Sequence, residues 1–168
     1  MDERVHDPYR RQHYQFTADG ENLIVDILVA RRGAVPSHLH PSQEERWTVV
    51  KGRVRFEVAG RRTAPDPGEE IVVPAGVKHS FKNIGPGEAQ VRAEVRPALE
   101  IEAFLTDAAM LAQAGYYTRH GLPTSLSGAR RMAAFLERYK QTAVILWPPR
   151  PVQRLLSALL LRNPTPEA

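Results

Sequence analysis

The sequence predicts a mainly β fold, a barrel or sandwich of short strands, with a C-terminal α-helical extension. Strand-like segments occupy residues 14–98, and Gly and Pro separate them at short intervals. In residues 90–96 apolar side chains alternate with charged ones, as in a strand that buries one face. After Pro97 the apolar residues recur at helical spacing instead. These observations predict one β core followed by helices.

Each predicted strand is bounded by turn residues. Gly52 makes a tight connection between two strands, and Pro74 and Gly76 punctuate the connection between two others. The predicted strands are residues 24–30, 47–50, 54–58, 70–73, 79–82 and 90–96. Many short strands spaced in this way indicate a sandwich or barrel.

Residues 99–168 are predicted to be a helical extension and not an independent domain. Apolar residues from Ile101 to Leu111 predict a first helix that ends near Gly115. A second helix has Ser127 as its expected N-cap, and a third begins after Pro151. Short amphipathic helices need another surface to bury their apolar faces. We therefore expect the extension to pack on the barrel or on the second subunit of a homodimer, with residues 144–147 as a buried strand or linker.

Composition limits the possible functions. The chain has 168 residues, enough for one core with an appendage, and no cysteine, so any metal must be held by nitrogen and oxygen. The net charge of +4 comes from arginines spread over the whole chain without interleaved aromatics, so we expect no nucleic-acid partner. The charged start leads into no apolar signal segment, and no apolar run is long enough to span a bilayer. We expect a cytoplasmic protein with no membrane partner.

Four residues form the candidate chemical site. His38 and His40 are two apart, so in an extended segment both imidazoles point to the same side. Glu45 adds a carboxylate, and His79 follows a separate turn. Taken singly, each has an ordinary reading: a surface or core histidine, or a solvated glutamate next to Glu44. In this order and combination they favour a metal site, since imidazole and carboxylate are good ligands for divalent metals.

The order and spacing resemble the two sequence motifs of the cupin superfamily. The first motif, Gly-x5-His-x-His-x3–4-Glu-x6-Gly, is matched by His38, His40, Glu45 and Gly52. This sequence departs from the first motif in one place, because only four residues separate Gly33 from His38. Either the turn is one residue shorter, or Arg32 stands where the family has glycine. The second motif, Gly-x5-Pro-x-Gly-x2-His-x3-Asn, matches at every position. Its residues are Gly68, Pro74, Gly76, His79 and Asn83.

The resemblance covers residues 22–97 and implies a cupin double-stranded β-helix, the jelly-roll barrel. It also implies one divalent transition metal (Fe, Mn, Ni, Co, Cu or Zn) bound by His38, His40, Glu45 and His79. Period-2 geometry places Trp47 on the face of Glu45 and Phe81 on the face of His79. The predicted substrate pocket comprises Trp47, Val49, Phe56, Phe81 and Arg96. Arg96 either borders the pocket mouth, where it could pair with a substrate carboxylate, or lies on the outside.

The leading functional hypothesis is a metal-dependent oxygenase acting on a small organic substrate. Glu45 would be the catalytic residue, as a metal ligand or, once displaced, as a proton acceptor. One alternative is a non-catalytic or sensory module that binds a small molecule or metal. Another is an isomerase or epimerase that uses the metal as a Lewis acid. An isomerase needs a second acid/base pair beside the metal, whereas the apolar Val49, Phe56 and Phe81 suit an oxygenase.

Overall fold

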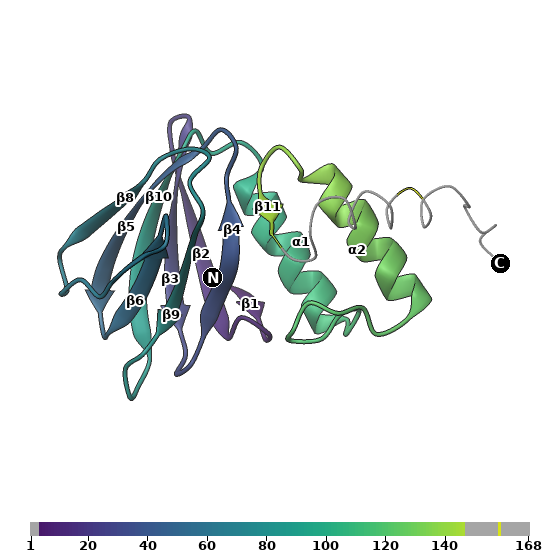
Figure 1. Ribbon diagram of the computed structural model, residues 1–168, viewed down its shortest axis with the longest axis horizontal. Helices are drawn as coiled ribbons and strands as arrows, with labels where there is room; N and C mark the ends of the chain where they lie inside the picture. The colour runs from purple at the N-terminus through teal and green to yellow at the C-terminus, as the bar shows by residue number, and fades with distance from the viewer. Residues whose placement is uncertain (1–3, 147–157, 159–168) are drawn as a thin grey trace.

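Two β-sheets face each other, and two helices lie beside them (Figure 1). The structure, a computed structural model, describes residues 4–146 and Ala158. The third predicted helix, after Pro151, lies outside the described residues. Within the described residues, no helix is both long and apolar enough to cross a membrane.

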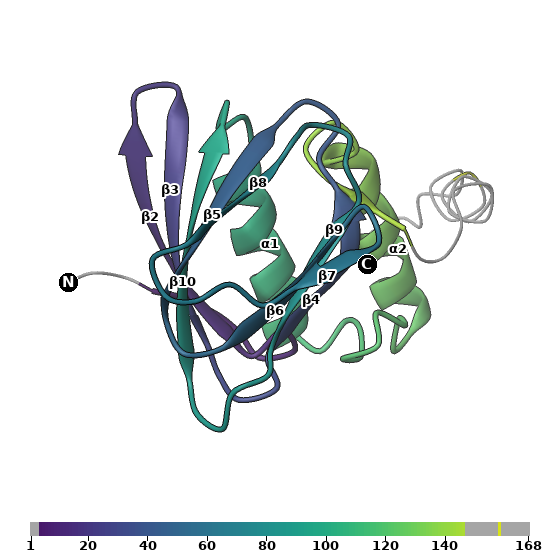
Figure 2. The ribbon, with the colours of Figure 1, turned by 60° about the vertical axis from the view of Figure 1, so that its left-hand side comes forward.

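The strands pair antiparallel throughout the two sheets. In spatial order, the six-stranded sheet contains β1 (Val5–Asp7), β2 (Gln12–Asp19), β3 (Asn22–Val29), β10 (Ala89–Arg96), β5 (Glu44–Lys51) and β8 (Glu70–Val73). The five-stranded sheet contains β11 (Val144–Ile145), β4 (Ala34–Leu39), β9 (His79–Asn83), β6 (Val54–Val58) and β7 (Arg61–Thr63). Figure 2 shows the two layers (β2, β3, β10 and β5 in one; β4, β6 and β9 in the other). The predicted jelly-roll class is confirmed.

The core lies between the sheets because apolar side chains recur at every second position of the central strands. In β3 and β10 the inward positions are buried and the outward positions are more exposed. Register aligns Val25 with Ala93, and Ala93 with Trp47, so neighbouring strands add their inward residues to one face. The alternation predicted for residues 90–96 is therefore confirmed, and it places β5 with Glu45 and Trp47 facing inward.

The sheets extend beyond the predicted strands at both ends of the chain. β1 and the first residues of β2 precede Tyr14, and Asp7 organises the turn between these strands by accepting hydrogen bonds from the backbone N–H groups of Tyr9 and Arg10. Far along the chain, β11 adds an edge to the five-stranded sheet by pairing with β4. The extension thus contributes a strand as well as helices.

The first helix, α1 (Ile101–Gln113), lies between the strands and α2 (Leu126–Arg138) in Figure 1. Its Ile101 and Phe104 belong to the barrel's apolar core, and Phe104 stacks on Phe135 of α2 with 5.2 Å between ring centroids. The expected N-cap of α2, Ser127, is corrected to Ser125. The Ser125 hydroxyl accepts a hydrogen bond from Gly128 N, three residues on, whereas Ser127 is already in the first helical turn.

The loop before the histidine pair resolves the departure in the first motif. Arg32 has φ of +65°, the left-handed conformation that glycine adopts without strain. Five residues separate Arg32 from His38, which is the spacing of the motif's glycine. The structure therefore supports the reading in which Arg32 replaces that glycine. Gly33 is needed for a different reason, since a Cβ there would lie 2.8 Å from Val29 Cγ1.

Candidate metal centre

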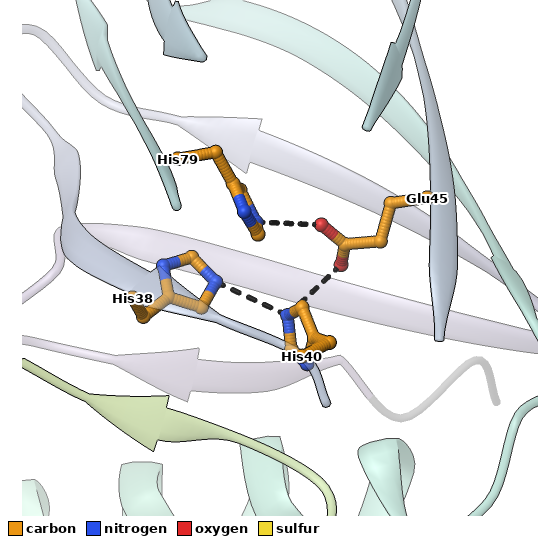
Figure 3. Close-up of side chains that lie close together, drawn as sticks. All are labelled: His38, His40, Glu45 and His79. Carbon is orange, nitrogen blue, oxygen red and sulfur yellow. Dashed lines mark hydrogen bonds and ion pairs between the residues drawn. The ribbon is translucent and has the colours of Figure 1, made fainter. Parts of the chain in front are cut away.

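Three strands and one loop bring the four predicted ligands together inside the barrel (Figure 3). His38 is on β4, His40 follows its end, Glu45 is on β5, and His79 begins β9. β4 pairs with β9, and the register sets His38 opposite His79. One ligand atom from each of the four residues lies within 4.8 Å of all the others. His40, Glu45 and His79 are buried and His38 is partly buried, so the centre is largely closed to solvent.

The distances between these atoms suit a common bound ion. His38 Nε2 and His40 Nε2 are 3.1 Å apart, and His40 Nε2 is 3.3 Å from Glu45 Oε1. His79 Nε2 is 2.8 Å from Glu45 Oε2. Ligand atoms bound at right angles to one metal, each at about 2.1 Å, would be about 3 Å apart. The donor atoms therefore already have the separations that a transition metal requires.

Backbone carbonyls fix which nitrogen of each imidazole faces the centre. Nδ1 of His38 lies 2.9 Å from the Pro36 carbonyl, Nδ1 of His40 lies 2.7 Å from that of Thr142, and Nδ1 of His79 lies 2.9 Å from that of Val77. A carbonyl oxygen only accepts, so each Nδ1 carries the proton and donates it. In the neutral rings each Nε2 is then unprotonated and carries a free lone pair. The three Nε2 atoms point at the centre of the cluster. Such second contacts orient metal-binding histidines in general.

The protonation states also suit a cation. Burial, together with the nearby His79 and His40, holds the pKa of His38 well below its usual value, so His38 is neutral at neutral pH. Burial alone would raise the pKa of Glu45, but the neighbouring His40 and His79 outweigh it and bring the pKa to about 2. Burial lowers the pKa of His79, yet contact with the Glu45 carboxylate raises it overall. Neutral nitrogens and an ionised carboxylate are the forms that bind metals.

One buried atom tests whether a metal fits. In its neutral form, Nε2 of His79 has no hydrogen-bond partner within the described residues, although the Glu45 carboxylate is beside it. Lone pairs on Nε2 and on the carboxylate then face each other, as do those of His38 and His40 Nε2, and a proton or a metal cation between them would relieve the repulsion. A divalent ion would more than offset the charge of Glu45 and would satisfy all four residues at once. The residues therefore fit the implied metal.

Trp47 positions the carboxylate. Its indole Nε1 donates a hydrogen bond of 3.0 Å to Glu45 Oε2, two residues along the same strand. Both side chains are buried, so this bond is not shared with bulk water. Glu44, the other glutamate of the pair, points outward and accepts from Arg46 Nε. The predicted choice of Glu45 over Glu44 follows the alternation of β5.

A cavity of about 50 Å³ adjoins the centre. At roughly 10–15 Å³ for each water-sized group, it has room for a small molecule. His38, His40 and Glu45 line it, so the ligands are reachable from the cavity. Most other lining residues are apolar and come from β3, β10, α1 and β11: Val25, Ile27, Ala93, Val95, Ile101, Phe104, Leu105 and Ile145.

The predicted pocket residues do not all reach this cavity. Trp47 lines it, whereas Val49, Phe56 and Phe81 are buried in the apolar core beside it. Phe81 packs on Trp47 with 5.0 Å between ring centroids, so it supports the cavity wall from behind. Arg96 is on the outer face of β10 and pairs with Glu94 there. Of the two positions expected for Arg96, the structure has the outer one and not the pocket mouth, because strand alternation turns Val95 inward and Arg96 outward.

Sequence reasoning missed several residues of the site. Arg10, Gln12 and Tyr14 line the cavity from the first hairpin, and the period-2 spacing of Gln12 and Tyr14 was the available signal. The Thr142 carbonyl and Ile145 come from the extension. No local pattern could have placed them there, because their contacts are with residues about a hundred positions earlier.

Comparisons with known proteins agree with this geometry. Residues 26–95 match the family model of the cupin domain. A polyketide synthase protein, CurC of Streptomyces cyaneus, is 26% identical over 82 residues, which are 48% of this chain and 53% of that protein. The chain therefore spans about half the length of this curated relative.

Solved structures show the same fold. An RmlC-like cupin from Shewanella frigidimarina aligns with a TM-score of 0.54 at 21% identity, over 61% of this chain and 89% of that one. KdgF from Halomonas sp. aligns with a TM-score of 0.52 at 18% identity, over 58% and 88% of the two chains. Together with the facing sheets, these matches show that residues 26–95 match a cupin domain and that the chain has the cupin fold.

Proposed function

We propose that the protein is a metal-dependent oxygenase that acts on a small organic substrate bound in the barrel. The observation that carries this proposal is the position of the His38, His40, Glu45 and His79 cluster at the wall of a mainly apolar cavity. A redox-active metal held there would supply the electron transfer by which dioxygen reacts with an organic molecule. Four protein ligands leave one or two coordination positions for other molecules.

The chain's own residues would exclude water, orient the substrate and handle a proton. Ile101, Phe104 and Leu105 of α1, with Ile145 of β11, form an apolar wall that limits the entry of water. Glu45 is ionised, and its Oε2 is held by Trp47. With a pKa of about 2 it is a weak base, so it would accept the proton of a substrate hydroxyl only where a bound metal makes that hydroxyl acidic.

The cavity favours oxygenation over isomerisation. Among the described lining residues, Arg10 and Tyr14 are the ionisable groups outside the metal cluster. Arginine stays protonated in proteins, and burial raises the pKa of the Tyr14 hydroxyl above its usual value. Neither group exchanges a proton readily near neutral pH. An isomerase would need such a pair beside the metal.

Oxygen consumption tests the proposal. Protein loaded anaerobically with Fe²⁺, Mn²⁺, Co²⁺ or Cu²⁺ is mixed with aerated buffer and a panel of small metabolites. The name of the Streptomyces relative adds polyketides to that panel. We expect substrate-dependent oxygen uptake with at least one redox-active metal and none with Zn²⁺, which occupies the same ligands without redox chemistry. Ligand binding without oxygen uptake across the panel would contradict the oxygenase and favour a binding module.

A further inference from the structure

The hairpin wall of the cavity carries polar side chains that the metal chemistry does not use. Arg10 lies in the turn after β1, and Gln12 and Tyr14 lie on β2. All three line the cavity. Gln12 is fully buried, and its Nε2 has no hydrogen-bond partner within the described residues. A buried amide in this state is costly unless a bound molecule satisfies it.

Hydrogen bonds hold both donors in place. The Tyr14 hydroxyl donates to Gln12 Oε1 at 2.8 Å, which fixes the amide and leaves Nε2 as its free end. Asp7 Oδ2 accepts from Arg10 Nη1 at 2.7 Å, and Asp7 is itself buried. A guanidinium has five N–H donors, so Arg10 keeps others for a ligand. A buried amide and a held guanidinium that line the same cavity form a site for an acceptor such as a carboxylate.

This polar group comes from the first hairpin, whereas the metal ligands come from β4, β5, β9 and the loop after β4. Ala34 N donates to the Arg10 carbonyl at 3.2 Å, and His38 follows four residues later on β4. Along a strand, four residues span at most about 13 Å. Val25, Ile27 and Phe104 belong to the apolar wall of the same cavity. The cavity therefore combines a donor group, an apolar wall and the metal ligands.

We propose that the ligand of this cavity is a small organic acid whose carboxylate accepts hydrogen bonds from Arg10 and Gln12. Its apolar body lies along the cavity and brings its other end toward the metal cluster. The inference rests on the proposed function in that it names the substrate class of the same site. A divalent ion with the single charge of Glu45 leaves the centre positive, which also favours an anionic ligand over a neutral one.

Binding to the full-length protein loaded with Zn²⁺ tests this without any turnover. The probes are acetate and propanoate, which suit a cavity of about 50 Å³, each compared with its neutral amide, acetamide or propanamide, by isothermal titration calorimetry. We expect at least one of the two acids to bind at least about tenfold more tightly than its amide, as charge-assisted hydrogen bonds are stronger than neutral ones.

Three variants assign that preference to the hairpin. Gln12→Leu removes the amide at similar volume, and the pair Asp7→Asn with Arg10→Met removes the charge without leaving a buried carboxylate unpaired. Each should weaken binding of the acid about tenfold and change binding of the amide less than about threefold. Arg92→Met is the matched control, because Arg92 forms an ion pair with Asp26 on the outer face of the sheet. It should bind like the unmodified protein.

Three results would overturn the inference: no binding of either acid, equal binding of acids and amides, or an undiminished acid preference in both hairpin variants. The last would mean that the acid binds the metal directly. Acid binding with the expected variant pattern but no oxygen uptake would leave this inference standing and defeat the oxygenase alone. Oxygen uptake with neutral substrates and no acid preference would defeat only the organic-acid site.

Discussion

His40 Nδ1 donates a hydrogen bond of 2.7 Å to the carbonyl oxygen of Thr142, a residue 102 positions further along the chain. Thr142 precedes β11, whose Ile145 pairs with His38 in register. Two of the four candidate metal ligands are thus in contact with the C-terminal extension. The extension therefore helps to build the metal centre and the cavity as well as covering the barrel.

Removal of this contact should weaken metal binding. In a chain that ends at Lys140, His40 has no carbonyl to fix its ring, and loss of such an outer contact typically costs 10- to 100-fold in metal affinity. Zn²⁺ competition against a chromophoric chelator measures the change. The control is a chain that ends at Leu146, which keeps Thr142 and β11. Circular dichroism verifies that both are folded, and equal Zn²⁺ affinity in the two would contradict the role of Thr142.

Trp47→Phe should loosen the Glu45 carboxylate. The substitution removes the indole N–H that holds Glu45 Oε2 and keeps an aromatic ring in the core. We expect metal to remain stoichiometric at saturation but to bind about tenfold more weakly. Phe81→Leu is the control, since Phe81 packs on Trp47 and has no polar group to lose. It should lower the free energy of unfolding by about 1 kcal/mol and leave metal affinity unchanged. Similar loss of metal affinity in both would contradict the positioning role.

Metal affinity should fall as the solution becomes acidic. Metals bind the neutral imidazole, and His79 has a pKa raised by Glu45, so it takes up a competing proton before His38, whose pKa is lowered. Below the pKa of His79, affinity should drop by about tenfold per pH unit. Glu45, with a pKa of about 2, stays ionised through this range. Co²⁺ titrations between pH 5 and 8 measure the slope, and an affinity constant over that range would contradict coordination by His79.

Arg32→Gly should stabilise the fold. Arg32 has a φ of +65°, a conformation that costs an L-residue about 1–2 kcal/mol relative to glycine. Glycine also makes the unfolded chain more flexible, and this entropy offsets about 0.5–1 kcal/mol of the gain. We expect the free energy of unfolding to rise by about 0.5–1 kcal/mol, measured by urea denaturation. Arg31→Gly is the matched control and should not stabilise, because Arg31 is not among the residues with positive φ. A loss of stability in Arg32→Gly would show that the Arg32 side chain compensates for its backbone.

The barrel could be predicted because its information is local. Alternation along residues 90–96 fixes which side chains face inward, and the same rule places Glu45 and Trp47 on one face of β5. The ligand set could be predicted from the spacing of the two motifs. The structure agrees with it, because paired strands set His38 opposite His79. Arg32 was open to two readings, because spacing alone does not reveal a left-handed φ.

What escaped prediction depends on contacts between distant segments. The hairpin that carries Arg10 and Gln12 reaches the cavity because β2 pairs with β3. Its first strand, β1, has three residues, which is too short for an alternating pattern to identify it as a strand. Arg96 was ambiguous because a charged face can border a pocket or meet solvent, and only the packing of β10 decides. The homodimer stays a prediction.

Elemental analysis of the full-length protein tests the central claim most directly. The protein is purified without chelators, incubated with Zn²⁺ or Fe²⁺, desalted and measured by mass spectrometry of the dissolved metal. We predict one metal per chain for the natural sequence and less than about a tenth of that for His40→Ala and His79→Ala, because each removes a ligand from the cluster. His120→Ala changes an exposed histidine outside the cluster and should keep the full metal content. Full metal in either ligand variant would contradict the assignment of this centre.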